Sequence, residues 1–413
     1  PQASRSSRPQ WSQELSRAVK SAFLATSLGL GLVSAPALRP PAAIAAPAPA
    51  GKLSSASAAG SRVNKDAESL LRYALPVKNK EVRELQAAVE DVKGQIAIRQ
   101  WSAGTSDVQK AMGVLKSKAA KILAAVPQEK QKAVQGQLDM LGGTLEDLRV
   151  ALAADGAGEV KGETKLKTCY DLQDKAANTV GAIEENMIPT NYHVQVPKEY
   201  NNLPQLDGRA KVQFVFKKGE PGEKFDLDGV LVDTVTLEMV ADGYNSPITA
   251  GNFVDLVHKG FYNNMAINRA DGFVVQTGEP KDATEKTNGY VPPGSSEVRR
   301  IPLEIALLAD KDPFYSTTID EDGRGGEPSR LPFQSTGALG MARAEYDNDS
   351  ASSQFFWLLF ESDLTPAGKN MMDGRYACFG YTTKGADYLP AIKAGDVVVS
   401  AKVLDGLDNL KAP

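Results

Sequence analysis

The chain has 413 residues, a formal net charge of −4 and a pI near 5.6. Its length predicts two or three domains, and the balanced charge gives no electrostatic support for nucleic-acid binding. The chain holds two cysteines, Cys169 and Cys378, and two histidines, His193 and His258, none at metal-ligand spacing. A His-based zinc site or a Ser-His-Asp triad therefore has very few residues to draw on, so we expect neither histidine to be catalytic and no metal or cofactor.

Residues 1–50 predict a targeting segment. A basic, Ser-rich start is followed by an uncharged apolar stretch from Ala22 to Leu38 and by the small residues of Pro41 to Ala50, which offer A-x-A cleavage sites. This order favours two-step import into an organelle and then across an internal membrane, and the alternative is a single secretory signal. The small polar residues 51–63 predict a flexible linker.

Residues 64–188 predict an antiparallel helical bundle. Apolar residues recur there at helical spacing in four stretches, near 82–96, 108–122, 134–152 and 169–187. The expected breaks between them are SAGTSD (102–107), VPQE (126–129) and ADGAGE (154–159). Cys169 lies on an apolar stripe, so we expect it to pack in the core. Short connections between helices of similar length favour antiparallel neighbours.

Pro189 ends the last predicted helix, and residues 189–209 read as a connector. Residues 210–413 then show the period of β-strands, interrupted by one predicted helix at 248–260. Many short strands separated by polar turns favour a closed barrel or a sandwich. The expected strands are 212–216, 230–240, 273–278, 339–342, 353–360, 376–382 and 396–404.

The stretch FDLDGVLVDT (225–234) resembles the nucleophile motif of haloacid-dehalogenase phosphatases, in which Asp226 and Asp228 would be catalytic. The polar KKGEPGEK precedes it in place of a buried strand, and no alternation of helices and parallel strands follows. We therefore interpret it as a hairpin loop in which Val230 begins a strand.

Six ordered segments of the second half resemble cyclophilins. They are PITAGNF (247–253), GFYNN (260–264), NRADGFVVQTG (268–278), GMARA (340–344), SQFF (353–356) and DGRYACFG (373–380). The resemblance covers about residues 210–413. It implies an eight-stranded antiparallel barrel closed by two helices and a peptidyl-prolyl cis-trans isomerase ancestry.

The isomerase reaction accounts for the residue types that these segments share. Rotation about an X-Pro bond meets a barrier of about 18–20 kcal/mol because the C–N bond has double-bond character. No covalent bond is made or broken, so a fixed donor and an apolar wall suffice. The resemblance implies these catalytic residues: Arg269, the donor to the prolyl nitrogen, Phe273, Gln276 and Phe356. It implies these substrate-binding residues: Val274, Ala342, Arg343, Met371, Met372 and Tyr376. Trp357 alternates with Phe356 along its strand, so we expect it to face the barrel core.

The front half adds a narrower resemblance. SLLRYALP (69–76), NKEVRELQ (79–86), the bundle and the leader are similar to the large thylakoid-lumen cyclophilins of plants and green algae, whose helical domain resembles the PsbQ subunit of photosystem II. This resemblance implies a location in the thylakoid lumen and a foldase role in photosystem II assembly and stability. The implied partners are proline-containing proteins, among them lumenal loops of photosystem II subunits. At most, the implied membrane contact is peripheral.

One departure keeps a second function open. Arg269 and Gly272 are separated by one residue fewer than cyclophilins usually have. Losing one residue reverses the direction of side chains on a strand unless a bulge absorbs the change. The alternative function is therefore a cyclophilin-fold chaperone or binding module with weak or no catalysis.

Overall fold

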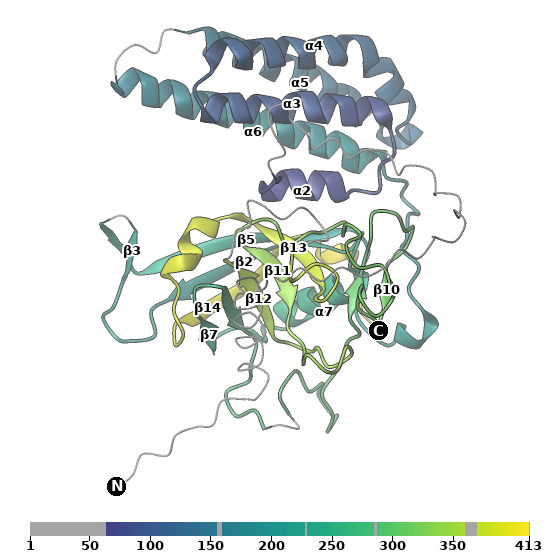
Figure 1. Ribbon diagram of the computed structural model, residues 1–413, viewed down its shortest axis with the longest axis vertical. Helices are drawn as coiled ribbons and strands as arrows, with labels where there is room; N and C mark the ends of the chain where they lie inside the picture. Colours follow the sequence, from purple (N-terminus) through teal and green to yellow (C-terminus); the bar gives the residue numbers. More distant parts are fainter. Residues whose placement is uncertain (1–62, 155–158, 228, 285–286, 360–369, 413) are drawn as a thin grey trace, which may run out of the picture.

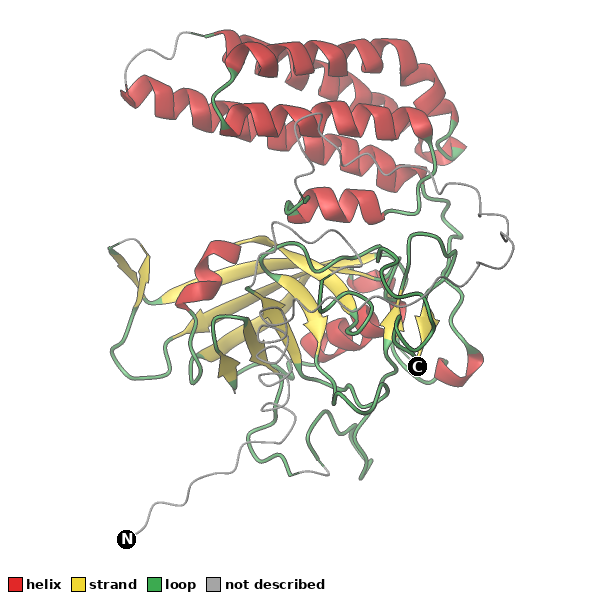
Figure 2. Cartoon of the chain, viewed as in Figure 1, coloured by secondary structure: helices red, strands yellow, loops and turns green. Residues whose placement is uncertain are grey.

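The computed structural model describes residues 63–154, 159–227, 229–284, 287–359 and 370–412, and it shows a helical bundle stacked on a curled β-sheet (Figures 1 and 2). The predicted targeting segment 1–50 and all but the last residue of the predicted linker lie outside these ranges. Within the described ranges, no helix is both long and apolar enough to cross a membrane.

The bundle consists of α3 (Lys80–Ala97), α4 (Trp101–Ala124), α5 (Gln131–Ala153) and α6 (Glu159–Met187), with a 3-10 turn, η1 (Gln128–Lys130), before α5. Each helix contacts the next, and α6 also contacts α3. The predicted apolar stripes form the shared core, since side chains such as Val89, Val108 and Leu145 are fully buried. The predicted bundle is therefore confirmed. Cys169 is a free, fully buried member of this core, as expected.

The predicted helix break at residues 102–107 is wrong. Helix α4 begins at Trp101. The chain turns before this residue, at Arg99, which adopts a left-handed φ of 55°. The hydroxyl Oγ1 of Thr105 donates to the carbonyl of Trp101 at 2.9 Å, so the polar side chain bonds within the helix. Gly104 lies against the Leu152 side chain, which is why a small residue stands at this crossing.

A nine-stranded sheet forms the second part of the molecule, and all its pairings are antiparallel. Its strand order is β6-β14-β2-β5-β13-β11-β12-β8-β7. These strands are β2 (Arg209–Lys217), β5 (Thr234–Asp242), β6 (Met265–Ala266), β7 (Arg269–Ala270), β8 (Val274–Thr277), β11 (Ala338–Met341), β12 (Phe355–Leu358), β13 (Cys378–Lys384) and β14 (Val397–Asp405). Three small two-stranded sheets accompany it: β1 (Gln205–Leu206) with β15 (Leu410–Lys411), β3 (Phe225–Leu227) with β4 (Val230–Val232), and β9 (Glu304–Ile305) with β10 (Phe314–Tyr315).

The two edge strands of the large sheet are neighbours in sequence, which curls the sheet round. Strand β6 pairs with β14 and β7 with β8, yet only Ile267 and Asn268 separate them. The N–H of Ile267 donates to Asp396 and that of Asn268 to Gln276, so the chain passes from one edge to the other within one residue. The barrel implied by the resemblance is therefore realised as a curled sheet of nine strands.

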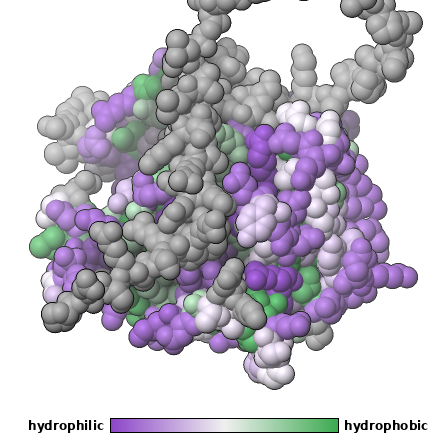
Figure 3. Space-filling model, turned by 60° about the horizontal axis from the view of Figure 1, so that its bottom comes forward, coloured by the Kyte–Doolittle hydropathy of each residue, from purple (hydrophilic) through white to green (hydrophobic). Residues whose placement is uncertain are grey.

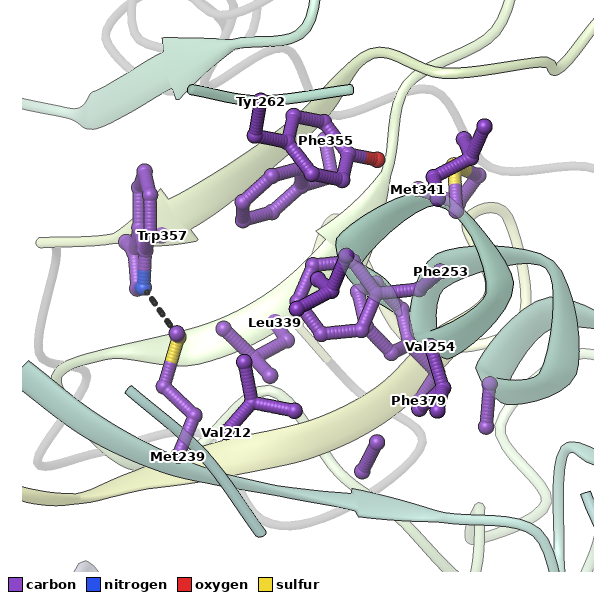
Figure 4. Packing of buried hydrophobic residues seen from close by; sticks show 14 of the residues in the cluster. Val212, Met239, Phe253, Val254, Tyr262, Leu339, Met341, Phe355, Trp357 and Phe379 are labelled. Atoms are coloured by element: carbon purple, nitrogen blue, oxygen red, sulfur yellow. Dashed lines mark hydrogen bonds between the residues drawn. The ribbon is translucent and has the colours of Figure 1, made fainter. Parts of the chain in front are cut away.

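Aromatic rings fill the interior of the curled sheet (Figure 4). Phe355 and Trp357 are fully buried, and their ring centroids lie 4.6 Å apart. The indole Nε1 of Trp357 donates to the sulfur of Met239 at 3.0 Å, which gives the buried donor a partner. Trp357 thus packs in the core, as its alternation with Phe356 predicts.

Helical segments from the second part of the chain pack against the sheet. Helix α7 (Pro247–His258) is buried along nearly its whole length, and Phe253 inserts into the aromatic core. Another segment, η3 (Ala386–Ala391), is a 3-10 helix that contains Pro390. Short 3-10 turns also occur at η2 (Lys198–Tyr200) and η4 (Leu407–Asn409).

The FDLDGVLVDT stretch forms the β3–β4 hairpin, as interpreted from sequence. A carboxylate oxygen of Asp226 accepts from the N–H of Gly229 at 2.7 Å, and Gly229 has a φ of +86°. Asp226 is thus a turn residue. Val230 and Leu231 follow it on β4 with 62% and 63% of their surface exposed. In Figure 3, which brings the bottom of Figure 1 forward, the coloured residues are mainly hydrophilic, with scattered hydrophobic ones.

A short helix that sequence periodicity missed, α2 (Ala67–Ala74), lies between the bundle and the sheet (Figure 1). Asp66 caps its first turn by accepting from the N–H of Ser69 at 2.7 Å. The side chains of Leu70, Leu71 and Ala74 are buried in one apolar cluster with sheet residues that include Phe356 and Tyr381.

Polar groups of the sheet bind the carbonyls at the end of α2. Arg209 donates to the carbonyl of Leu71 at 2.5 Å and pairs with the buried Asp242 at 2.6 Å. Asn245 donates to the carbonyl of Ala74 at 3.0 Å. These carbonyls lie where a helix leaves acceptors unsatisfied, so the sheet completes the hydrogen bonding of α2.

We predict that Leu71→Ala lowers the free energy of unfolding by about 2–5 kcal/mol, because it removes buried methyl groups at the contact between α2 and the sheet. Chemical denaturation monitored by circular dichroism measures the change. The control is Val150→Ala on α5, where 54% of the side chain is exposed and the change should stay within about 0.5 kcal/mol. Equal effects of the two substitutions would contradict a packed contact.

Candidate functional site

The register of four strands places three of the predicted site residues, Arg269, Gln276 and Phe356, in one row across the sheet. Arg269 on β7 is opposite Gln276 on β8, Gln276 is opposite Phe356 on β12, and Phe356 is opposite Gly340 on β11. Directly opposed residues of antiparallel strands share a face of the sheet. The neighbouring row, Ala270, Val275, Trp357 and Leu339, has the opposite orientation and supplies core residues.

The shortened connection after Arg269 does not disturb this row. Residues Asp271 to Phe273 join β7 to β8, and the N–H of Asp271 donates to the carbonyl of Val274 at 3.3 Å. Gly272 has a φ of +81°, a conformation that glycine adopts at little cost. The missing residue is thus absorbed in a tight turn, and Arg269 remains on the same side of the sheet as Gln276 and Phe356.

The ring of Phe356 is fixed by three neighbours. A Cβ added to Gly340 would lie 2.1 Å from Cζ of Phe356, so the ring lies directly over the glycine. The ring of Phe333 stacks at a centroid distance of 6.0 Å, and that of Tyr376 meets Phe356 edge to face, also at 6.0 Å. Phe356 is 1% exposed.

The other predicted apolar residues divide between buried and exposed positions. Val274, Ala342 and Met372 are buried in the same cluster as Phe356, and Phe273 and Tyr376 pack against it while partly buried. Met371 has 38% of its surface exposed and is outside the cluster. The structure thus brings together every predicted apolar site residue except Met371.

Arg343 binds the backbone of two loops. Its Nε and Nη2 donate to the carbonyl of Arg375, and its Nη1 donates to those of Ala344 and Glu345 at 2.8 and 3.0 Å. The guanidinium also lies 5.2 Å from the centre of the Tyr376 ring. Arg343 therefore ties the loop after β11 to the loop that carries Tyr376.

Polar contacts orient the two polar residues of the row. Gln276 is 1% exposed, and its Nε2 donates to Oε1 of Gln354 at 3.1 Å. The Arg269 side chain is 10% exposed and pairs with Asp271. Its Nη1 is buried without a hydrogen-bond partner in the part of the chain that the structure describes. Arg269 thus keeps a donor group that the surrounding residues leave unused.

Sequence reasoning missed three residues that contact this set: Phe333, Gln354 and Asp271. Phe333 comes from the segment between β10 and β11, where no periodic pattern marks it. Gln354 belongs to the SQFF segment (353–356) that resembles cyclophilins. The sequence alone did not indicate that its side chain would bind Gln276. Asp271 precedes a glycine, a pattern typical of turns that could have marked it.

A buried carboxyl group lies near this set. Glu304 borders a small pocket that Phe333 and Tyr376 also line. Its carboxylate accepts from the N–H groups of Ile248 and Thr249 at 3.2 and 2.8 Å, at the start of α7. Burial raises the pKa of Glu304 to about 7, although these hydrogen bonds favour the charged form.

The two histidines lie away from the row. His193 pairs with Asp207 at 3.0 Å, and His258 is exposed at the end of α7. Cys378 is free and buried on β13, where it lies opposite Gly340 in the same cluster as Phe356. No group of three or more His, Cys, Asp or Glu side chains suited to a metal ion occurs in the described ranges.

The curled antiparallel sheet thus carries an arginine, a glutamine and a phenylalanine in one row. Residues 230–408 match the family described as cyclophilin type peptidyl-prolyl cis-trans isomerase/CLD. Residues 66–188 match a family described as the PsbQ-like domain of CYP38-like peptidyl-prolyl cis-trans isomerases.

Two relatives match over most of the chain. The chloroplastic peptidyl-prolyl cis-trans isomerase CYP38 of Arabidopsis thaliana is 39% identical over 94% of this chain and 85% of its own length. A Synechocystis protein, named provisionally as a thylakoid lumen peptidyl-prolyl cis-trans isomerase, is 38% identical over 84% of each chain. The chain therefore belongs to the cyclophilin-type peptidyl-prolyl cis-trans isomerases that carry a PsbQ-like helical domain. Among solved structures, the Mimivirus cyclophilin matches with a TM-score of 0.32 and 16% identity over 50% of this chain and 95% of its own.

We predict that Gly340→Ala lowers the free energy of unfolding by about 1–3 kcal/mol, because the new methyl group meets the Phe356 ring. Denaturation measures the loss, and the NMR signals of the Phe356 ring should shift. The control is Gly94→Ala on α3, where no heavy atom lies within 4 Å of the added Cβ. Alanine should raise stability there by about 0.5–1 kcal/mol. A loss at both positions would contradict the proposed contact.

We predict that Glu304 makes the protein less stable at pH 8 than at pH 5. Its folded pKa of about 7 lies above the ordinary value of 4.5, so its contribution is fully present below pH 4.5 and is lost as pH rises through 7. Between pH 5 and pH 8 the unsubstituted protein should lose about 1–3 kcal/mol more than Glu304→Gln. Denaturation of both proteins at both pH values measures this difference. Equal losses in the two proteins would refute a raised pKa of Glu304 in the folded state.

Proposed function

We propose that this chain catalyses cis-trans isomerisation of X-Pro bonds in protein substrates. The observation that carries the proposal is the row Arg269, Gln276 and Phe356 on one face of the sheet. Arg269 supplies the donor to the prolyl nitrogen through its unused Nη1, and Phe356 with Phe273 and Met372 supplies the apolar wall. Twisting the amide removes its resonance, so a donor to the nitrogen lowers the barrier.

The remaining predicted residues take supporting roles in this proposal. Gln276 and Ala342 hold the substrate backbone, and Val274 and Tyr376 border the prolyl ring. We assign Met371 and Arg343 to substrate binding as well, since both lie on loops next to Tyr376. The exposed side chain of Met371 supports contact with residues that flank the proline.

We predict that Arg269→Ala lowers kcat/KM on a proline-containing peptide by about 100- to 1000-fold, the usual effect of removing one transition-state donor. A protease-coupled or NMR exchange assay measures the rate. The control is Arg149→Ala in the bundle, where the arginine pairs only with Glu146 among the described residues and the rate should not change.

A second candidate, a binding module without turnover, is favoured by the burial of Phe356 and Gln276, each 1% exposed. A prolyl ring must contact Phe356 for the first proposal to hold. Equal rates for the unsubstituted protein and Arg269→Ala would reject isomerisation and leave this second candidate.

We further propose that the protein acts in the thylakoid lumen on lumenal loops of photosystem II subunits, as a foldase in their assembly and stability. The PsbQ-like match of residues 66–188, the name of the Synechocystis relative and the targeting segment predicted at 1–50 support this proposal. The corresponding domains are 64–188 for the bundle, 189–209 for the connector and 210–413 for the sheet. Contact with the membrane would be peripheral.

We predict that the immobilised protein retains a proline-containing lumenal loop peptide of a photosystem II subunit at least about 10-fold better than the same peptide with proline replaced by alanine, because the apolar wall recognises the prolyl ring. Fluorescence of labelled peptides measures retention. Equal retention of both peptides would contradict recognition at this site.

A further inference from the structure

Asp271, in the turn between β7 and β8, is absent from the residues that the resemblance implies, yet it contacts three of them. One carboxylate oxygen, Oδ2, accepts from Nε of Arg269 at 2.8 Å and lies 2.5 Å from its Nη2. The other oxygen, Oδ1, accepts from the N–H groups of Phe273 and Val274, each at 3.1 Å. A single side chain therefore joins the donor arginine to the turn that carries Phe273.

We propose that Asp271 is a positioning residue that fixes the Arg269 guanidinium for catalysis, an inference that rests on the proposed isomerase function. An arginine side chain has several rotatable bonds and loses much rotamer freedom when it is ordered. Contacts to Nε and Nη2 hold one edge of the planar guanidinium. The plane is then fixed, and Nη1 is the nitrogen left without a partner among the described residues.

The turn keeps the carboxylate itself in place. Gly272 adopts a left-handed φ of +81°, which lets the two N–H groups that follow point at Oδ1. Asp and Asn commonly accept from N–H groups two or three residues onward, and the bonds fix their χ angles. The shortened connection between Arg269 and Gly272 therefore brings an anchored acceptor beside the arginine.

The contact differs from an ordinary surface ion pair. Exposed pairs are weak because both side chains must be ordered in water. Here the Arg269 side chain is only 10% exposed, and Asp271 is 37% exposed. Partial burial disfavours the charged carboxylate, but hydrogen bonds from Arg269 and from the backbone outweigh it and hold the pKa of Asp271 below its usual value. The acceptor thus stays ionised at neutral pH.

The test compares Asp271→Asn with Asp233→Asn in the full chain. Asn can still accept through Oδ1 from Phe273 and Val274, so the turn is retained, while its Nδ2 donor replaces the acceptor that faces Arg269. Asp233 forms an exposed pair with Lys224 at 2.9 Å, so the control makes the same chemical change away from the row.

The first readout is the ¹⁵N–¹H signal of Arg269 Nε, assigned by its loss in Arg269→Lys. In the unsubstituted protein and in Asp233→Asn this proton should exchange slowly with solvent. In Asp271→Asn exchange should be about 10-fold faster, because the hydrogen bond to Oδ2 is lost. An unchanged signal in Asp271→Asn would overturn the proposal.

The second readout is the rate of peptide isomerisation. Asp271→Asn should lower kcat and kcat/KM equally, by about 10-fold, because misplacing the donor removes an interaction made in the transition state. A higher KM with unchanged kcat would also overturn the positioning role. If the unsubstituted protein and Arg269→Ala turn over equally slowly, the isomerase function itself fails, and the Nε signal alone then decides whether Asp271 holds Arg269.

Discussion

The antiparallel pairing of β8 with β7 on one side and β12 on the other determines where every other part of the site lies. Main-chain hydrogen bonds set this register, and because side chains alternate along a strand, one register assigns Trp357 to the core and Phe356 to the opposite face. A slip of one residue would exchange the two rows and bury Gln276 in the aromatic core. The strand pairing therefore decides which side chains share the face that carries Arg269, Gln276 and Phe356.

The curl of the sheet depends on the same pairing. Strand β7 stands at one edge and β6 at the other, and the two residues between them carry the chain across. Arg269 is the first residue after this crossing, so the closure of the sheet and the placement of the donor are decided within a few residues. The tight turn at Gly272 follows at once, which leaves Arg269 between two fixed points of the backbone.

Much of this could be predicted from the sequence, and the failures have physical causes. Apolar periodicity located the four bundle helices because their cores are local stripes, and alternation placed Trp357 inside the sheet. The break predicted at 102–107 failed because small polar residues that favour turns also bond within a helix, as Thr105 does. Helix α2 was missed because its eight residues are short for a periodic signal and are buried against a distant part of the chain. The partners Phe333 and Gln354 depend on tertiary contacts that no local pattern encodes.

The cluster that holds Phe356 also links the site to the helical part of the molecule. Leu70 and Leu71 of α2 belong to the same buried cluster as Phe333, Phe356 and Met372. Packed interiors have few voids, so neighbours in one cluster constrain one another's positions. Arg209 and Asn245 donate to the carbonyls of Leu71 and Ala74. These hydrogen bonds hold the end of α2 in place, in addition to the packing of its apolar side chains on the sheet. The apolar cluster around Phe356 is thus built from both parts of the chain, and α2 packs on the sheet as part of that cluster.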